Sequence, residues 1–166
     1  MNALIVYYSL GGNTEFAARK MAERLKAELL KLEPVKAYPD KGFKKFFWGG
    51  KSAVMAEKPE LKPCQFDPER YDLIIFGFPV WAGNIAPPLR TFVSRNDLKP
   101  VRYAAFACQS GSGAEKAFEK LKACLGHGLE KTLILIDPKD KPDPAKEAQM
   151  EDFCDSLAGP GMLPVL

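Results

Sequence analysis

The chain has 166 residues and a formal net charge of +3, with 46% hydrophobic and 27% charged residues. This length suits a single domain over residues 1–166 and is too short for two ordinary ones, and the composition is that of a soluble globular protein. No apolar run approaches the roughly 18 residues of a membrane span, and the first strand begins too early to leave room for a signal peptide, so we expect a cytoplasmic protein.

The chain opens on a continuously apolar run, Ala3 to Tyr8, which is typical of a strand covered on both faces in a parallel sheet. After a short loop, apolar residues recur at helical spacing with charged residues opposite them, which predicts a helix packed on the sheet. The apolar positions are Phe16, Met21, Leu25, Leu29 and Leu32. We expect Pro34 to end this helix and residues 35–38 to form a short second strand.

The loop between these elements, Tyr8-Ser-Leu-Gly-Gly-Asn-Thr14, predicts an anion site, because a strand that restarts as a helix leaves backbone N–H groups free. It matches neither the dinucleotide pattern G-x-G-x-x-G nor the NTPase pattern G-x-x-x-x-G-K-[ST]. Ser9 and Thr14 stand where a cysteine phosphatase or arsenate reductase would carry a thiolate and an arginine. We interpret the loop as a cation-free cradle for a phosphate monoester, formed by these hydroxyls, the Asn13 amide and backbone N–H groups. The alternative is an ordinary turn capped by Asn13 or Thr14.

From Pro39 to Pro68 the pattern weakens around a basic and aromatic segment, residues 41–51. Seven lysines stand against three acidic residues between Lys36 and Lys62, so electrostatic docking should depend on this part of the chain. We expect a short helix here, with Trp48 as its hydrophobic anchor, as a lid over a ligand or as part of a partner-docking patch. No nucleic-acid-binding fold accompanies the lysines, so nucleic acid is not an expected partner.

Three further strands follow, each ending in a loop. Tyr71 to Phe78 is fully apolar and leads into the loop Pro79–Asn84, after which Pro87 and Pro88 suit the first turn of a helix. The inner face of that helix is formed by Leu89, Phe92 and Val93.

Arg102 to Cys108 forms the next strand and leads into the small-residue loop Gln109–Gly113. A helix ended by Gly126 follows, then a strand from Thr132 to Ile136 and a proline-rich turn from Asp137 to Pro144. The buried face of the helix ended by Gly126 is predicted at Ala117, Phe118, Leu121, Cys124 and Leu125. A last helix follows the turn, and its buried face is predicted at Met150, Phe153, Cys154 and Leu157.

Alternating strands and helices predict an α/β fold with a parallel sheet, and ligands of such sheets bind at the carboxyl ends of the strands. The glycine-bearing loops after the first, third and fourth strands should therefore converge on one site. The cysteines, at positions 64, 108, 124 and 154, form no C-x-x-C pair. We interpret them as reduced thiols rather than disulfides or metal ligands.

These loops resemble those of the flavodoxin family in its short form. The resemblance depends on Ser9–Thr14, on Gly77–Asn84 followed by Pro87-Pro88, and on Ala107–Gly113. It implies a three-layer, doubly wound five-stranded parallel sheet with strand order 2-1-3-4-5 and flavin mononucleotide (FMN) as the cofactor. The implied cofactor-binding residues are Ser9, Leu10, Gly11, Gly12, Asn13, Thr14, Pro79, Val80, Trp81, Ala82, Gly83, Asn84, Cys108, Gln109, Ser110, Gly111 and Gly113.

Within this set the resemblance gives the phosphate to Ser9–Thr14, the isoalloxazine ring to Pro79–Asn84 and its pyrimidine edge to residues 108–113. Trp81 would stack on the ring, or else only pack its own loop. Gly83 would let its peptide turn so that a carbonyl accepts the N5 hydrogen of reduced flavin. We interpret Cys108 as a small buried hydrophobe, and His127 as structural.

No catalytic acid, base or nucleophile accompanies the loops. The leading hypothesis is therefore an FMN protein that transfers electrons between redox partner proteins. The alternatives are an NAD(P)H-dependent FMN reductase of quinones or similar small acceptors, and a flavin-free scaffold of the same fold. Because the net charge is positive, we expect a less negative potential for reduced flavin than in strongly acidic electron shuttles.

Overall fold

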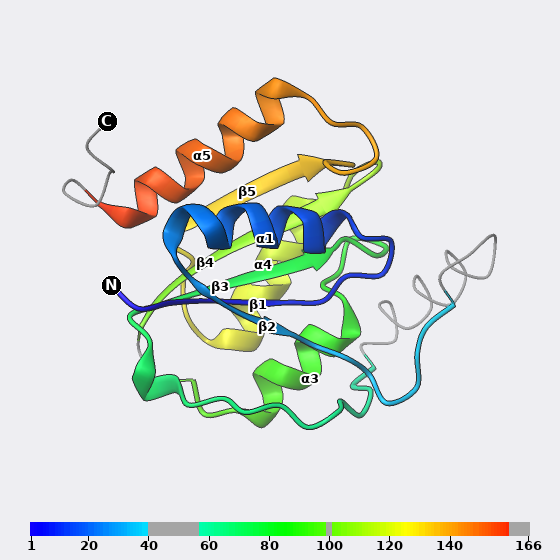
Figure 1. Cartoon of the computed structure of the whole chain (residues 1–166). Helices are drawn as coiled ribbons and strands as arrows, with labels where there is room; N and C mark the ends of the chain where they lie inside the picture. The colour runs from blue at the N-terminus through cyan, green and yellow to red at the C-terminus, as the bar shows by residue number, and fades with distance from the viewer. Residues whose placement is uncertain (40–56, 99–100, 160–166) are drawn as a thin grey trace.

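The computed structural model describes residues 1–39, 57–98 and 101–159, which form a five-stranded parallel sheet with helices on both faces (Figure 1). The order across the sheet is β2-β1-β3-β4-β5, which confirms the predicted order 2-1-3-4-5. The strands are β1 (Ala3–Tyr7), β2 (Glu28–Lys31), β3 (Leu73–Pro79), β4 (Arg102–Gln109) and β5 (Lys131–Ile136). All of their carboxyl ends meet at one edge, toward which the arrowheads point in Figure 1.

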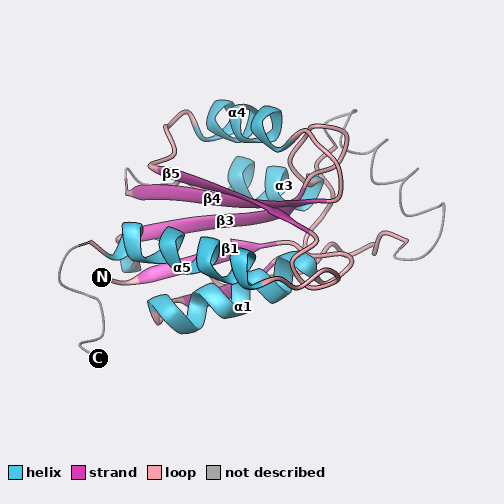
Figure 2. Ribbon diagram, turned by 90° about the horizontal axis from the view of Figure 1, so that it is seen from above, coloured by secondary structure: helices cyan, strands magenta, loops and turns pink. Residues whose placement is uncertain are grey.

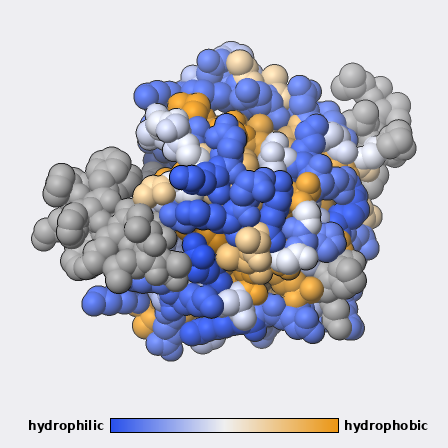
Figure 3. All heavy atoms as spheres, turned by 180° about the vertical axis from the view of Figure 1, so that it is seen from behind, coloured by the Kyte–Doolittle hydropathy of each residue, from blue (hydrophilic) through white to orange (hydrophobic). Residues whose placement is uncertain are grey.

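Helices α1 and α5 lie on one side of the sheet, and α3 and α4 lie on the other (Figure 2). They are α1 (Asn13–Leu25), α3 (Pro87–Arg95), α4 (Ala114–Leu125) and α5 (Pro144–Ala158), with a 3₁₀ turn at Pro68–Arg70. The outer surface on the α3 and α4 side is mainly hydrophilic, with small separate apolar patches (Figure 3). Across the described residues, no helix is both long and apolar enough to cross a membrane.

The central strands are apolar on both faces because each face supports a separate core. In β3, Phe76 and Phe78 pack with α3 and α4, whereas Leu73 and Ile75 pack with α1 and α5. Strands β1 and β4 divide their residues in the same alternating way. The continuous apolar runs of the sequence therefore have the origin that a buried parallel sheet predicts.

The second strand lies earlier in the chain than the sequence predicted. Helix α1 ends at Leu25, where Lys26 takes a left-handed φ of 52°, and β2 follows at Glu28–Lys31 rather than at residues 35–38. The 13 residues of α1 span roughly 20 Å, about the length of the strands that the helix must recross. A helix continuing to Pro34 would overshoot the sheet, so Leu29 belongs to an edge strand and its helical spacing is coincidental.

Two other expectations need correction, and a third lies outside the described residues. Cys124 of the predicted α4 stripe is exposed, and Leu125 is only partly buried. Pro34 does not precede a strand of the sheet but forms an antiparallel bridge with Leu61. The basic and aromatic segment 41–51 lies outside the described residues.

Candidate functional site

Four loops enclose one cavity of about 310 Å³ at the carboxyl edge of the sheet, which we call the edge cavity. Three of these loops are those predicted to converge, after β1, β3 and β4, and the fourth is the turn between β5 and α5. The cavity is lined by Ser9, Leu10, Gly11, Asn13, Thr14, Pro79, Val80, Trp81, Ala82, Cys108, Gln109, Ser110, Gly111, Ser112, Asp137 and Asp140.

The loop after β1 has the geometry of an anion cradle. Gly12 is the residue before α1 and takes a φ of 97°, which glycine adopts without steric cost. The Ser9 hydroxyl accepts a hydrogen bond from the Glu15 N–H at 3.1 Å, so it satisfies one of the free donors of the first turn. Thr14 is only 2% exposed and also lines the cavity. This end of the cavity therefore offers hydroxyls and the remaining N–H groups of the helix terminus.

The Asn13 side chain, predicted to face the phosphate, bonds instead to the turn after β5. Its Oδ1 accepts from the N–H groups of Lys139 (2.8 Å) and Asp140 (3.2 Å), and its Nδ2 donates to the Asp140 carboxylate at 2.8 Å. The Lys139 ammonium also donates to the Gly11 carbonyl at 3.0 Å. The sequence showed a loop without a cation, but a lysine from 126 residues further along the chain lies against it.

The loop after β3 is a tight two-residue turn. Trp81 and Asn84 exchange backbone hydrogen bonds of 3.2 and 3.0 Å, and the residues between them have positive φ values, 51° for Ala82 and 69° for Gly83. Positive φ at both central residues is typical of a type I′ turn. The Asn84 side chain accepts a hydrogen bond from the Lys120 ammonium of α4. The turn is therefore fixed from both ends and holds Trp81 at the cavity.

The Trp81 indole is half-buried within an aromatic group. It meets Tyr8 edge to face at 5.7 Å between ring centroids, and Tyr38 at 5.3 Å. Burial raises the pKa of Tyr8 well above its ordinary range, so the phenol remains neutral. These contacts fix the indole at the cavity wall.

The loop after β4 is built from residues that also organise α4 and the last turn. The Gln109 side-chain carbonyl accepts from the Ala114 N–H at 3.0 Å, and the Ser110 hydroxyl donates to Asp137 at 2.6 Å. That hydrogen bond lowers the pKa of Asp137, which is therefore a carboxylate near neutral pH. Burial raises the pKa of the Cys108 thiol to about 12, so this cysteine is neutral.

Four predicted residues are not among those that line the cavity: Gly12, Gly83, Asn84 and Gly113. Gly113 supports the loop after β3, because a Cβ at this position would come within 3.0 Å of the Gly83 Cα. The sequence reasoning missed Ser112, Asp137 and Asp140. The position of the last turn after a β-strand, at the carboxyl edge of the sheet, was the only available signal for the two aspartates.

Replacing Gly113 with alanine should destabilise the protein by about 2 kcal/mol and weaken any ligand bound in the edge cavity. Its φ of 109° disfavours a side chain, and the new Cβ would push against the Gly83 backbone. Gly126→Ala is the matched control, because Gly126 also has a positive φ (64°) but open space around it. Equal losses of thermal stability in the two variants would show that only backbone strain matters.

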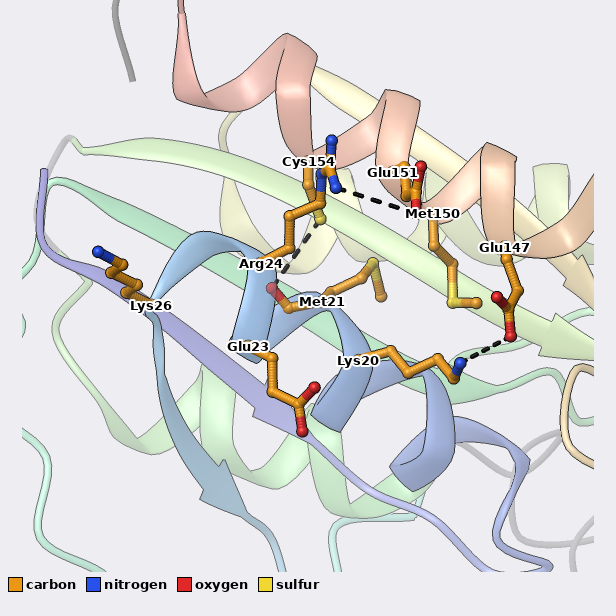
Figure 4. A pocket seen from close by; sticks show the side chains of 9 residues that line it. All are labelled: Lys20, Met21, Glu23, Arg24, Lys26, Glu147, Met150, Glu151 and Cys154. Atoms are coloured by element: carbon orange, nitrogen blue, oxygen red, sulfur yellow. Dashed lines mark hydrogen bonds and ion pairs between the residues drawn. The ribbon is translucent and has the colours of Figure 1, made fainter. Parts of the chain in front are cut away.

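A larger cavity, about 450 Å³, lies between α1 and α5, away from the convergent loops. Its rim is closed by ion pairs, Lys20 with Glu147 at 2.7 Å and Arg24 with Glu151 at 3.9 Å (Figure 4). The Cys154 thiol below them is buried and faces the Met21 carbonyl at 3.9 Å. Burial raises the pKa of this thiol to about 12, and the Lys20 and Arg24 charges beside it are paired, so the cavity offers no thiolate and we assign it no ligand.

The family model described as Flavodoxin matches residues 2–139. The chain belongs to the flavodoxin family. The match contains the loops after β1, β3 and β4, and the predicted resemblance is thereby confirmed. Among proteins with curated descriptions, none matches this flavodoxin-family chain.

Solved structures show the same fold. A flavoprotein of Lactobacillus acidophilus NCFM in complex with FMN has a TM-score of 0.71 at 23% identity, covering 84% of this chain and 95% of that one. A Bacteroides uniformis ATCC 8492 protein provisionally described as a flavoprotein has a TM-score of 0.74 at 22% identity, covering 91% and 96%. An azoreductase of Bacillus anthracis str. Sterne has a TM-score of 0.52 at 14% identity, covering 95% and 99%. At these identities the likeness supports the fold alone.

Proposed function

We propose that this flavodoxin-family protein binds FMN in the edge cavity and carries electrons between redox partners. The observation that supports the proposal most strongly is the chemistry of the cavity wall. One end offers hydroxyls and the start of α1, which suit a phosphate monoester. Another wall offers Val80 and Trp81, which suit a flat apolar ring system. Asp137 and Asp140 are acceptors for the hydroxyl groups of a ribityl chain.

The flavin supplies the electron chemistry when bound, since it accepts and releases one or two electrons. The residues of this chain bind and orient it. Ser9 and Thr14 would hold the phosphate, and Trp81 would cover the ring. The turn Ala82–Gly83 would present backbone groups to the ring edge. In the described part of the cavity lining, the only thiol is the neutral Cys108 and there is no histidine, so we assign no proton transfer to a side chain.

The proposal is tested by titrating the apoprotein with FMN and following flavin fluorescence and absorption. We expect saturable binding of one FMN per chain, with micromolar or tighter affinity. Reduction of the bound flavin should require a separate reductase and should proceed slowly with NADH or NADPH alone. A protein that takes up no FMN would instead be a flavin-free scaffold.

A second candidate function, reduction of small acceptors with NAD(P)H, is favoured by a further cavity. About 350 Å³ in volume, it shares Ser9 and Leu10 with the edge cavity and is lined on another side by Tyr8 and Tyr38. An aromatic-walled space next to a flavin site suits a flat quinone. Steady oxidation of NADH or NADPH on addition of a quinone, without any added reductase, would favour this function over electron carriage.

The positive charges on α4 should make the bound flavin easier to reduce. Lys120 bonds to Asn84, and the Lys116 side chain lies 3.2 Å from the position of a Cβ on Gly83, so both ammonium-bearing chains lie behind the turn that carries Trp81. Lys120→Met should shift the two-electron midpoint potential to more negative values by roughly 10 to 30 mV, because reduced flavin is anionic. Redox titration measures the shift. Lys122→Met, which removes a lysine paired with Glu119, is the control and should leave the potential unchanged.

A further inference from the structure

The Lys139 side chain packs over Gly12, in the loop after β1, where the absence of a side chain leaves space for it. Its ammonium donates to the Gly11 carbonyl at 3.0 Å, and its side chain crosses Gly12 so closely that a Cβ there would lie 2.9 Å from Nζ and 3.3 Å from Cδ. The absence of a side chain at Gly12 therefore makes room for the lysine. Any other residue at position 12 would displace it.

The position of Lys139 is set by its backbone as well. Its N–H donates to Asn13 Oδ1 at 2.8 Å, and Asn13 Nδ2 donates to Asp140 at 2.8 Å. The turn after β5 is also tied to the loop after β4 through Ser110 and Asp137. The lysine therefore projects from a turn that is attached to two neighbouring loops, and its approach to Gly11 does not depend on the side chain alone.

We infer that Lys139 is a positioning residue for the phosphate of the cofactor and the source of the positive charge that the loop lacks. This inference rests on the proposed FMN binding. In a trans peptide the C=O and N–H point in opposite directions, and no peptide of the described chain is cis. By holding the Gly11 carbonyl, Lys139 fixes the Gly12 N–H on the opposite side of the same peptide and polarises it as a donor. The ammonium is also separated from the expected phosphate position only by the Gly11–Gly12 peptide to which it is bonded.

Lys139 must exert this effect against a nearby negative charge, because the Asp140 carboxylate lies 3.6 Å from its ammonium. Asp140 also lines the edge cavity. The lysine therefore attracts a bound phosphate dianion and the aspartate repels it. Removing one of the two charges should change the affinity for the dianion in the corresponding direction.

The test compares FMN with riboflavin, which has the same ring and ribityl chain but no phosphate. Lys139→Met should weaken FMN binding about tenfold and leave riboflavin binding unchanged. Lys139→Arg should keep FMN affinity close to that of the unmodified protein. The dependence of FMN affinity on salt should be smaller in Lys139→Met, because one charge interaction has been removed. Lys141→Met is the matched control, since Lys141 lies on the same turn but pairs with Asp137 at 3.1 Å.

A second variant keeps the test independent of any damage to the loop. Asp140→Asn preserves an acceptor for Asn13 and removes the negative charge, so FMN affinity should rise several-fold relative to riboflavin affinity. Equal loss of FMN and riboflavin in Lys139→Met, or unchanged FMN affinity in both variants, would overturn the inference. Absence of FMN binding by the unmodified protein would instead refute the proposed function, so the two failures are distinguishable.

Discussion

Trp81→Ala is expected to weaken FMN binding by roughly 10- to 100-fold, the largest loss we predict for a single side chain of the edge cavity. Stacking of a flat heteroaromatic ring on an aromatic side chain contributes about 1 to 3 kcal/mol. The indole lines the cavity and is fixed by edge-to-face contacts with Tyr8 and Tyr38, so little conformational freedom is lost when a ring packs on it. Removing it takes away the only large aromatic side chain among the described residues that line the cavity.

The measurement uses titration with FMN, and the two tryptophans of the chain offer a direct readout. In a Trp48→Phe background, Trp81 is the only indole, and its fluorescence should be quenched as FMN binds. Trp81→Phe keeps an aromatic ring and should lose only a few-fold in affinity. If Trp81→Ala binds FMN as tightly as the unmodified protein, the indole merely packs its own loop.

The sequence was sufficient to place four of the five strands and three of the four loops of the site, because both depend on strong local patterns. Runs such as Leu73 to Phe78 have no polar face, and only a strand buried on both sides explains them. A parallel sheet then brings every strand-to-helix loop to the same edge. Glycines and hydroxyl residues at three of those loops consequently predicted one shared cavity.

The second strand was missed because its local pattern is ambiguous. Leu25, Leu29 and Leu32 have the spacing of a helix face, yet Leu29 is 37% exposed on an edge strand. Helix α1 ends at Leu25 because its length must match that of the strands on which it packs. A short stretch of sequence carries no information about that length. A single residue with a left-handed φ, Lys26, makes that ending possible without glycine.

The turn after β5 was predicted, but its place in the site was missed for a different reason. Residues 137–141 read Asp-Pro-Lys-Asp-Lys, and a proline among charged side chains is typical of a solvated turn. This turn is attached to the other loops by side chains distant in sequence: Asn13 accepts from the Lys139 N–H, and Ser110 donates to Asp137. Such contacts have no local signature. They become visible only when the carboxyl ends of β1, β4 and β5 are placed together.

Gly77→Ala is expected to cost about 3 kcal/mol of stability and to lower Tm by roughly 9 °C. Gly77 lies in β3 directly opposite Phe106 of β4, and a Cβ at this position would come within 2.2 Å of the Phe106 ring. That ring is fully buried under α1 and α5 and cannot move away without opening the core. Position 77 therefore requires glycine because the Phe106 ring of the neighbouring strand occupies the space of a side chain, and not because of the backbone conformation of Gly77.

Thermal unfolding with the matched control Gly128→Ala checks this prediction, since a Cβ on Gly128 meets nothing within 4 Å and should change stability by less than about 0.5 kcal/mol. In the double variant with Phe106→Leu, the shorter side chain makes room for the added methyl group. The combined loss should therefore be smaller than the sum of the two single losses. Strictly additive losses would show that the ring and the methyl group do not compete for the same space, and that Gly77 is required for another reason.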